Sequence, residues 1–548
     1  MDITSLSPPE DGHEVHKAIL EGITTCITNW TKSAKDEQGN PPKLMIRILF
    51  GNTIANVPGM KTKWNQFYYD LEKVLTNPAL QELIKGINEK PVVLYGSDVG
   101  HTGTSIMSSF NHSKIVAGDG HYAIVGGHNM CEEVSSKEYP VIHDITSEVT
   151  GPGARTANTF AGSLWLKAAE SGRLTIYSFN WGKKKFDDLS RSSAKRWAPN
   201  NNVYYSTGTQ KEVPNVIRDQ YWYYNMQDLD AITNKQAAPN GSVAATVIMG
   251  IGRWGDVNVF GTKGEGLKRG KDIDRNINAC QYASDLLKRA MIIDQTNWYI
   301  RMSQQDLVND GRFGKLQASE HTICERLAWR LHANPLCVAI QIVVSARFSQ
   351  NMEGLAYSYG DGPREAIERI SNNLHGLAPV NRSMLSSMFN TPKHLKILDL
   401  SNGLGRADFI SPDNFDTKDP LSYCTVAPLA FCDTEYANRT RGSYVWIDSE
   451  YKPESLFANQ RFFDKKNDKK FGPGNHAKVM FVSDVNDADD TAVVMIGSDN
   501  MYPSPLAEFS FIIEGAEAIK QFREQYWNKL WKYSEPLGFK VDSEGTIT

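Results

Sequence analysis

The order of apolar and polar residues predicts alternating helices and strands, and the same order occurs in both halves of the chain. In the second half, apolar residues at helical spacing and short apolar runs predict a helix, a strand, a helix and a strand at residues 276–293, 298–302, 321–332 and 338–345. The first half predicts a strand, a helix and a strand at residues 3–6, 15–28 and 44–50. Only the leading helix has no counterpart there, so we infer that residues are absent upstream of Met1.

The apolar runs are short. The longest, 244–249 and 338–344, fall far below the ~20 residues of a membrane-spanning helix, and they are typical of buried strands. With 41% hydrophobic and 22% charged residues, the chain has enough apolar material for a globular core. A net charge of −4 disfavours non-specific nucleic-acid binding, because no overall positive field attracts a polyanion.

This duplication predicts an α/β protein with two lobes, residues 1–275 and 276–548. Two segments lack a counterpart in the other half, about 151–271 and about 400–474, and we expect them to form loops around the site. The first is rich in aromatic residues, which suit either ordinary core packing or a lipid–water boundary with binding of a quaternary ammonium group. Its candidate side chains are Trp165, Trp181, Trp197, Tyr221, Trp222, Tyr223 and Tyr224.

One short motif occurs once in each half, on a predicted strand. It reads His112-Ser113-Lys114 in the first half and His476-Ala477-Lys478 in the second. Each copy is followed by a strand that returns to a glycine and an asparagine. These are Gly127 with Asn129, and Gly497-Ser498 with Asn500. We expect all of these residues to line one site.

The residue types fit chemistry on a phosphodiester. Lys114, Lys478, Asn129 and Asn500 supply cations and amide donors for the anionic phosphate oxygens. One imidazole can attack phosphorus while the other protonates the leaving oxygen and later activates water. This chemistry requires no metal and no cofactor.

Other patterns carry less information. Gly250–Gly255 matches a dinucleotide-binding glycine pattern, but no helix is predicted after it, so we expect a tight loop after a strand at 243–249. The acidic run 484–490 lacks the glycine and distal glutamate of a calcium loop, so we expect a solvated turn. The seven cysteines are scattered and favour free thiols.

The duplicated motif resembles the signature of the phospholipase D superfamily, H-x-K-x4-D followed by G-G/S-x-N. His112, Lys114 and Asp119 match the first signature at full spacing. In the second copy Ser483 stands at the aspartate position, and a shifted strand end would let Asp484 take its place. Residues 111–127, 303–307, 496–514 and 531–534 further resemble bacterial phospholipases D, including the murine-toxin type.

The resemblance implies a duplicated α-β-α-β-α sandwich with pseudo-twofold symmetry and one active site between the lobes. It implies that His112 forms a phosphohistidine and that His476 is the general acid and then the base. It also implies that each imidazole is oriented by a carboxylate from the other half. The matching positions pair Glu508 with His112 and Asp144 with His476.

The primary hypothesis is therefore a phospholipase D that meets its phospholipid substrate peripherally, at a membrane or micelle surface. A phosphodiesterase or nuclease of the same superfamily and a non-catalytic phospholipid-binding toxin component are the alternatives. We expect no nucleic-acid partner and no transmembrane segment. A soluble bacterial protein, secreted or cytoplasmic, fits the sequence, which does not predict an oligomeric state.

Overall fold

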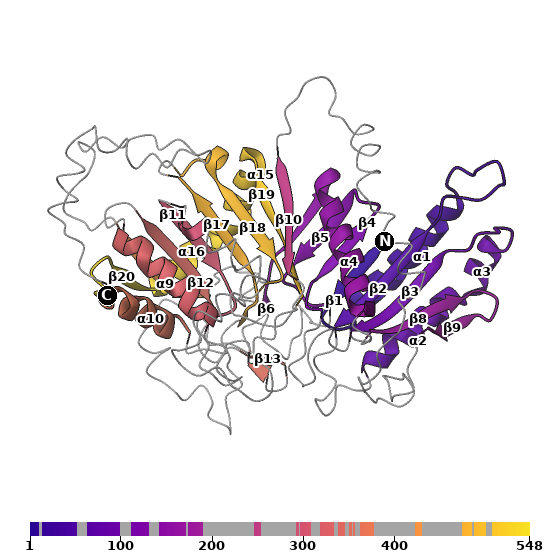
Figure 1. Cartoon of the computed structure of the whole chain (residues 1–548), viewed down its shortest axis with the longest axis horizontal. Helices are drawn as coiled ribbons and strands as arrows, with labels where there is room; N and C mark the ends of the chain where they lie inside the picture. Colours follow the sequence, from indigo (N-terminus) through magenta and orange to yellow (C-terminus); the bar gives the residue numbers. More distant parts are fainter. Residues whose placement is uncertain are drawn as a thin grey trace, which may run out of the picture.

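Two eight-stranded mixed sheets lie side by side in the computed structural model of the chain (Figure 1). The structure describes residues 1–9, 14–51, 63–98, 111–130, 142–170, 174–189, 246–253, 292–294, 296, 298–307, 318–333, 338–345, 350–352, 355–356, 362–377, 422–429, 474–484, 487–499 and 507–548.

The first sheet has the strand order β7-β5-β4-β1-β2-β3-β8-β9. Its strands are β1 (Asp2–Ser5), β2 (Met45–Gly51), β3 (Val92–Asp98), β4 (Ile115–Gly118), β5 (Tyr122–Gly126), β7 (Thr146–Thr150), β8 (Leu174–Asn180) and β9 (Lys185–Asp188). The second sheet has the order β10-β19-β18-β17-β11-β12-β15-β20. Its strands are β10 (Val247–Arg253), β11 (Tyr299–Ser303), β12 (Ala339–Val344), β15 (Tyr423–Pro428), β17 (Val479–Ser483), β18 (Val493–Gly497), β19 (Glu508–Glu514) and β20 (Phe539–Asp542).

The two sheets repeat one topology. The run β7-β5-β4-β1-β2-β3-β8 corresponds strand for strand to β19-β18-β17-β11-β12-β15-β20. In both runs the two central junctions, β1–β2–β3 and β11–β12–β15, are parallel and the other junctions are antiparallel. Strands β9 and β10 lie outside this correspondence, one at the end of each sheet. The duplication expected from the sequence is therefore present in the topology.

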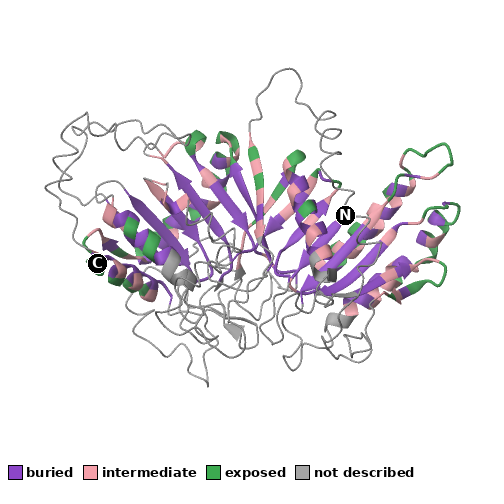
Figure 2. Cartoon of the chain, viewed as in Figure 1, coloured by how far each residue is buried: buried purple, intermediate pink, exposed green. Residues whose placement is uncertain are grey.

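Helices cover the outer face of each sheet and fill the space between the sheets (Figures 1 and 2). They are α1 (Glu14–Thr31), α2 (Lys63–Leu75), α3 (Pro78–Ile84), α4 (Arg155–Glu170), α9 (Ala318–Ala333), α10 (Pro363–His375), α15 (Ala516–Phe522) and α16 (Asn528–Ser534). Short additional pieces are the strand pairs β6 (Ile142–His143) with β16 (Gly474–Asn475) and β13 (Gln350–Met352) with β14 (Leu355–Ala356), the turns at Pro152–Ala154, Asp489–Thr491 and Glu535–Leu537, and a π-helical turn at Arg523–Trp527.

Three apolar clusters separate these layers. Helices α1, α2 and α3 pack on the first sheet, and α9 and α10 pack on the second. The third cluster joins both sheets through α4, α15 and α16, and it includes Trp165, Phe509 and Trp531. The order of layers is thus α-β-α-β-α, and the predicted fold class is confirmed.

Most predicted elements of the repeat lie within a residue or a few residues of the observed ones. Helix α1 buries Ile23, Ile27 and Trp30, which recur at helical spacing on one face. The Asp119-Gly120 turn between β4 and β5 has φ of 53° and 65°, as a tight hairpin requires. The predicted helix at 276–293 falls almost entirely outside the described residues.

The first insert differs from the expectation of loops. Its described parts include α4, β8, β9 and β10, and Trp165 of α4 is fully buried in the central apolar cluster. Trp181 donates its indole N–H to the carbonyl oxygen of Pro91 at 2.7 Å. These two tryptophans therefore serve packing and not a lipid boundary, while the other five aromatic candidates lie outside the described residues.

The glycine-rich segment 250–255 was expected to be a loop, but its first residues belong to a strand. Gly250 and Gly252 lie within β10, which pairs with β19 of the second sheet. A Cβ on Gly250 would lie 2.5 Å from the hydroxyl oxygen of Thr156, and one on Gly252 would lie 2.5 Å from the ring of Phe160. Glycine is needed there because α4 packs directly on the strand. Strand β10 precedes residue 275 yet belongs to the second sheet, so the lobe boundary at 275/276 stays a prediction.

Within the described part of the chain, no helix combines the length and the apolar character needed to cross a bilayer. Among the same residues, Cys26, Cys324 and Cys424 are free thiols.

Candidate active site

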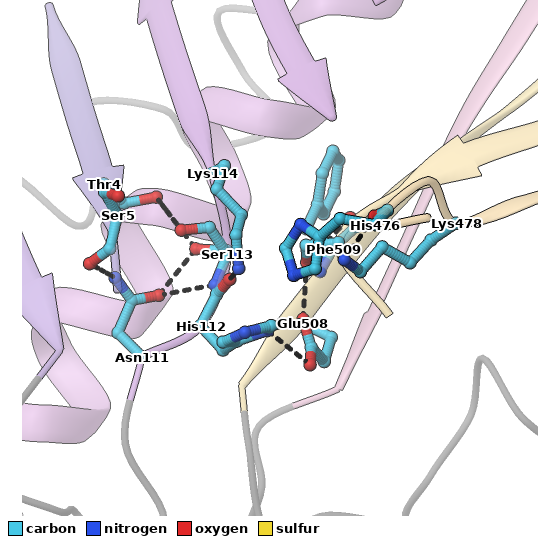
Figure 3. A network of polar contacts seen from close by, with 11 residues as sticks. Thr4, Ser5, Asn111, His112, Ser113, Lys114, His476, Lys478, Glu508 and Phe509 are labelled. Carbon is cyan, nitrogen blue, oxygen red and sulfur yellow. Dashed lines mark hydrogen bonds and ion pairs between the residues drawn. The ribbon is translucent and has the colours of Figure 1, made fainter. Parts of the chain in front are cut away.

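The two His-x-Lys segments precede strands β4 and β17 and do not lie on them as predicted. Their backbones turn instead toward the other half of the molecule. The N–H of His112 donates to the carbonyl oxygen of Ala507 at 2.9 Å, and the N–H of His476 donates to that of His143 at 2.7 Å. Each segment therefore leaves its own sheet where the lobes meet, which brings the two motifs together (Figure 3).

An asparagine immediately precedes each of the two histidines. In the first segment, Asn111 fixes the backbone conformation. The side-chain oxygen of Asn111 accepts from the backbone N–H of Ser113 at 3.0 Å and from its hydroxyl at 2.6 Å. The amide nitrogen of Asn111 donates to the carbonyl oxygens of Ser5 at 3.1 Å and Leu49 at 3.3 Å. This side chain thus connects the motif to Ser5 at the end of β1 (Figure 3) and to Leu49 within β2.

Asn475 does the same in the second half. Its side-chain oxygen accepts from the N–H of Ala477 at 3.2 Å. Its amide nitrogen donates to the hydroxyl of Ser303 and the carbonyl of Val343, both at 3.0 Å. Neither asparagine was predicted as a site residue, although an identical residue before both histidines was a usable signal.

Each imidazole contacts a buried carboxylate from the opposite half. Nδ1 of His112 lies 2.8 Å and 3.0 Å from the two carboxylate oxygens of Glu508, at the start of β19. Nδ1 of His476 lies 2.8 Å from a carboxylate oxygen of Asp144, which follows β6. The structure therefore brings together both crossed pairs that the resemblance implied, while their catalytic roles stay a prediction.

The residue after the first glycine of each Gly-Gly/Ser-x-Asn segment makes the two pairs unequal. Ser498 donates its hydroxyl to Glu508 Oε2 at 2.6 Å, so this carboxylate is held by both a histidine and a serine. In the other half the equivalent residue is Gly127, where a Cβ would lie 2.3 Å from an Asp144 carboxylate oxygen. Asp144 instead accepts from the backbone N–H of Ile145 at 2.7 Å. Gly127 is thus required by the close approach of Asp144.

The two lysines are buried beside the histidines. Nζ of Lys114 donates to the carbonyl oxygen of His112 at 2.6 Å, and Nζ of Lys478 makes the same contact with the carbonyl oxygen of His476. Both side chains are less than 5% exposed. Folding each ammonium group back onto its own motif places positive charge at the junction of the lobes.

These charges and the burial set the protonation of the histidines. Burial lowers the pKa of His112 to about 4, and the Glu508 carboxylate acts in the opposite direction. Burial, and then the charges of Lys478 and Lys114, hold the pKa of His476 well below its ordinary value. Lys114 belongs to the other half, which is a further sign that the two motifs share one site. Both imidazoles are neutral near pH 7.

The remaining predicted residues fall in several places. Asn129 is buried, 4% exposed, just after β5. Asn500 lies outside the described residues. Asp119 occupies the hairpin turn after β4, away from the imidazoles along the chain.

In the second half Ser483 donates its hydroxyl to Asp487. Arg301 donates to both oxygens of Asp487 at 2.9 Å and 2.6 Å, and Arg523 approaches it at 2.7 Å. The Asp487 carboxylate therefore lies at this strand end, three residues after Asp484, and the substitution of the signature aspartate by Asp484 stays a prediction.

In the part of the chain that the structure describes, no group of three or more His, Cys, Asp or Glu side chains could hold a metal ion. Metal independence stays an expectation.

Comparisons with known proteins give a distant but nearly full-length relative. No family model matches the chain. It is 22% identical over 551 residues to phospholipase D from Streptomyces antibioticus, covering 98% of this chain and 74% of the relative. Among solved structures, it matches phosphatidylserine synthase from Haemophilus influenzae Rd KW20 with a TM-score of 0.42 and 12% identity, over 97% of this chain and 81% of that one. The chain is therefore similar in sequence, at a distance, to a phospholipase D over nearly its whole length.

Proposed function

We propose that the protein is a metal-independent phospholipase D. It hydrolyses the distal phosphodiester of glycerophospholipids, so that phosphatidylcholine or phosphatidylethanolamine yields phosphatidic acid and the head-group alcohol. The observation that carries the proposal is the crossed pair of His–carboxylate contacts flanked by two buried lysines. The distant relationship to a phospholipase D favours a phospholipid substrate over other phosphodiesters.

In the first step His112 attacks phosphorus. Because Glu508 accepts the hydrogen on Nδ1, the lone pair of Nε2 is free to form a bond to phosphorus. A P–N bond forms, the P–O bond to the head group breaks, and its electron pair leaves on the head-group oxygen. His476 donates a proton to that oxygen, which leaves as a neutral alcohol.

In the second step His476 acts as a base. It removes a proton from water, the oxygen forms a new P–O bond, and the electrons of the P–N bond return to His112. The products are phosphatidic acid and the free enzyme. Another alcohol in place of water gives transphosphatidylation by the same steps.

The cations and the pKa values fit these roles. Lys114, Lys478 and Asn129 stabilise the negative charge on the phosphate oxygens as phosphorus becomes five-coordinate. The lowered pKa of His476 suits a base for water. For the first step its pKa must rise, and the negative charge of the bound phosphodiester between the lysines acts in that direction.

A substrate with an activated leaving group separates the two roles. p-Nitrophenol needs no proton to depart, so phosphatidyl-p-nitrophenol in mixed micelles tests the nucleophile alone. We expect wild type to turn over continuously and His476→Ala to give one burst of p-nitrophenol, with an acid-labile phosphoenzyme that accumulates. His112→Ala is expected to give neither a burst nor a phosphoenzyme.

Three outcomes would count against the proposal. If hydrolysis persists in His112→Ala, His112 is not the nucleophile. If His112→Ala gives a burst and His476→Ala gives none, His476 is the nucleophile and His112 the acid and base. Cleavage of single-stranded or duplex DNA with no release of choline from phosphatidylcholine micelles favours the nuclease alternative. The net charge of −4 argues against that alternative.

A further inference from the structure

The residue before each orienting carboxylate differs between the halves. Ala507 precedes Glu508, and His143 precedes Asp144. Their backbones make equivalent contacts. Ala507 forms a parallel β-bridge with Asn111, and His143 pairs in parallel with Asn475. A methyl group in one half therefore corresponds to an imidazole in the other.

The imidazole of His143 connects the Asp144 strand to the C-terminal helices. Its ring stacks on Tyr526 with centroids 5.4 Å apart and an interplanar angle of 14°. Its Nε2 lies 3.0 Å from the Tyr526 hydroxyl, which donates to the Ser303 hydroxyl at 3.0 Å. With that proton directed to Ser303, the hydrogen of His143 lies on Nε2, facing the phenol oxygen.

The contacts continue into the catalytic segment. Ser303 accepts from the amide nitrogen of Asn475, which immediately precedes His476. The carbonyl of His143 accepts the N–H of His476 at 2.7 Å. Burial raises the pKa of Tyr526 above its ordinary value, and the nearby Asp144 carboxylate adds to this. Tyr526 thus lies near Asp144, and through Ser303 it is connected to the residue before His476.

A helical irregularity places this tyrosine. Residues Arg523–Trp527 form a π-helical turn between α15 and α16. Such turns are rare and occur often at functional sites, because an extra residue in the turn rotates a side chain out of the regular helical pattern. Here Phe522 and Trp527 are buried in the central apolar cluster, while Tyr526 reaches His143 and Ser303.

The corresponding position in the first half is filled differently. By strand register, Ser303 opposite Val479 corresponds to Thr4 opposite Ile115. Thr4 shares a hydrogen bond of 2.8 Å with the Ser113 hydroxyl, within its own lobe. The His112 half is thus connected locally, whereas the His476 half is connected to a distant helix.

We propose that His143 and Tyr526 form a positioning pair that fixes Asp144 and His476 for the acid–base steps. The pair does not contact the reacting atoms and does not serve the His112 half. This inference rests on the proposed function, because it assigns a purpose to the inequality of the two half-sites. It predicts that weakening the pair slows only those steps that need proton transfer by His476.

The variants follow from the pseudosymmetry. Tyr526→Phe removes one hydroxyl and keeps the ring, and His143→Ala installs the residue that the other half has at the same position. Tyr533→Phe on α16 is the matched control, because it removes a hydroxyl from a half-buried tyrosine whose ring centroid lies 5.4 Å from the ammonium group of Lys532. Thermal unfolding of all four proteins monitors folding.

Two rates are compared in each variant. With phosphatidylcholine, whose leaving alcohol needs a proton, we expect kcat to fall about five- to tenfold in Tyr526→Phe and further in His143→Ala, with KM little changed. The p-nitrophenol burst rate should stay within about twofold of wild type, and the phosphoenzyme should decay more slowly. Tyr533→Phe should match wild type in every rate.

Equal losses in the burst rate and in choline release would overturn the inference, since they indicate general disruption. Rates of Tyr526→Phe equal to those of Tyr533→Phe would also overturn it. Either result leaves the proposed function intact if wild type still forms a phosphoenzyme. Absence of phosphoenzyme and choline release in wild type rejects the proposed function itself.

Discussion

Replacing Glu508 by Gln removes the carboxylate charge beside His112 with almost no change of shape. Glu508 is fully buried, and its two oxygens lie 2.8 Å and 3.0 Å from Nδ1 of His112. The Ser498 hydroxyl donates to Oε2 at 2.6 Å. In the variant this donor favours the amide oxygen on its side, which turns the amide N–H₂ toward Nδ1. His112 then carries its hydrogen on Nε2, where the nucleophilic lone pair is needed.

The size of the effect follows from these two losses. A hydrogen bond to a charged group contributes about 1.5–3 kcal/mol, which corresponds to a loss of about 10- to 150-fold in rate. The wrong tautomer adds to this loss. In the serine-protease triad, where an Asp–His pair has the same relation, the Asp→Asn change lowers kcat about 10⁴-fold. We therefore expect phosphoenzyme formation in Glu508→Gln to slow by about 10²- to 10⁴-fold.

The matched variant is Asp144→Asn, which makes the same change on the His476 side. With phosphatidyl-p-nitrophenol, rapid mixing should show the burst lost in Glu508→Gln and kept within about threefold in Asp144→Asn. Turnover after the burst should slow in Asp144→Asn, because the base for water is misoriented. Equal burst rates in the two variants, with unchanged thermal unfolding, would refute the crossed assignment of roles.

Three further predictions concern stability. Burial lowers the pKa of His143 to about 4, so below about pH 6.5 the unfolded chain binds a proton that the folded chain does not. The free energy of unfolding should therefore fall as the pH is lowered toward 4. In urea titrations at several pH values, the slope of this free energy against pH should be smaller in His143→Gln than in wild type, by up to about 1.4 kcal/mol per pH unit. Arg47→Met leaves Asp2 charged and fully buried, so urea unfolding should show a loss of about 3–5 kcal/mol, and a loss under about 1 kcal/mol would contradict this. Asp487→Ala should cost about 2–3 kcal/mol in urea unfolding, because it leaves the buried Arg301 without its main partner, and a loss under about 0.5 kcal/mol would contradict this.

The sequence predicted those parts of the fold that depend on neighbouring residues. Helix α1 and the hairpin β4–β5 follow from local periodicity and from an Asp-Gly turn, which specify structure within a few residues. The two halves were predicted because the same local order occurs twice. The layer order required the family resemblance, since periodicity does not show which faces pack together.

Long-range pairing explains the errors. Strand β10 was recognised as an apolar run, but its place beside β19 depends on contacts between segments far apart in the chain. Gly250 and Gly252 suggested a loop because glycine lacks a strand preference. Their actual cause is the close approach of Thr156 and Phe160 on α4, which only the packed structure reveals.

The candidate site divides in the same way. The histidines and lysines were predicted because their motif occurs twice in the sequence, and the carboxylates were predicted from the resemblance to the phospholipase D superfamily. Asn111 and Asn475 were missed because an asparagine in a sequence is typical of any turn, and its value here lies in donors that reach strand ends elsewhere. Tyr526 was missed because a π-helical turn has no signal in local periodicity.

The unequal halves have a physical reason in the chemistry proposed for them. The nucleophile must present one lone pair in one tautomer, and a carboxylate held by a second donor, Ser498, fixes that arrangement. The acid–base histidine must lose and regain a proton during each turnover, so its partner Asp144 has to tolerate both charge states. A carboxylate supported by a backbone N–H and by a neutral pair, His143 and Tyr526, keeps its position without adding a competing charge. The two halves share one topology, and the side chains of Ser498, His143 and Tyr526 make their half-sites different.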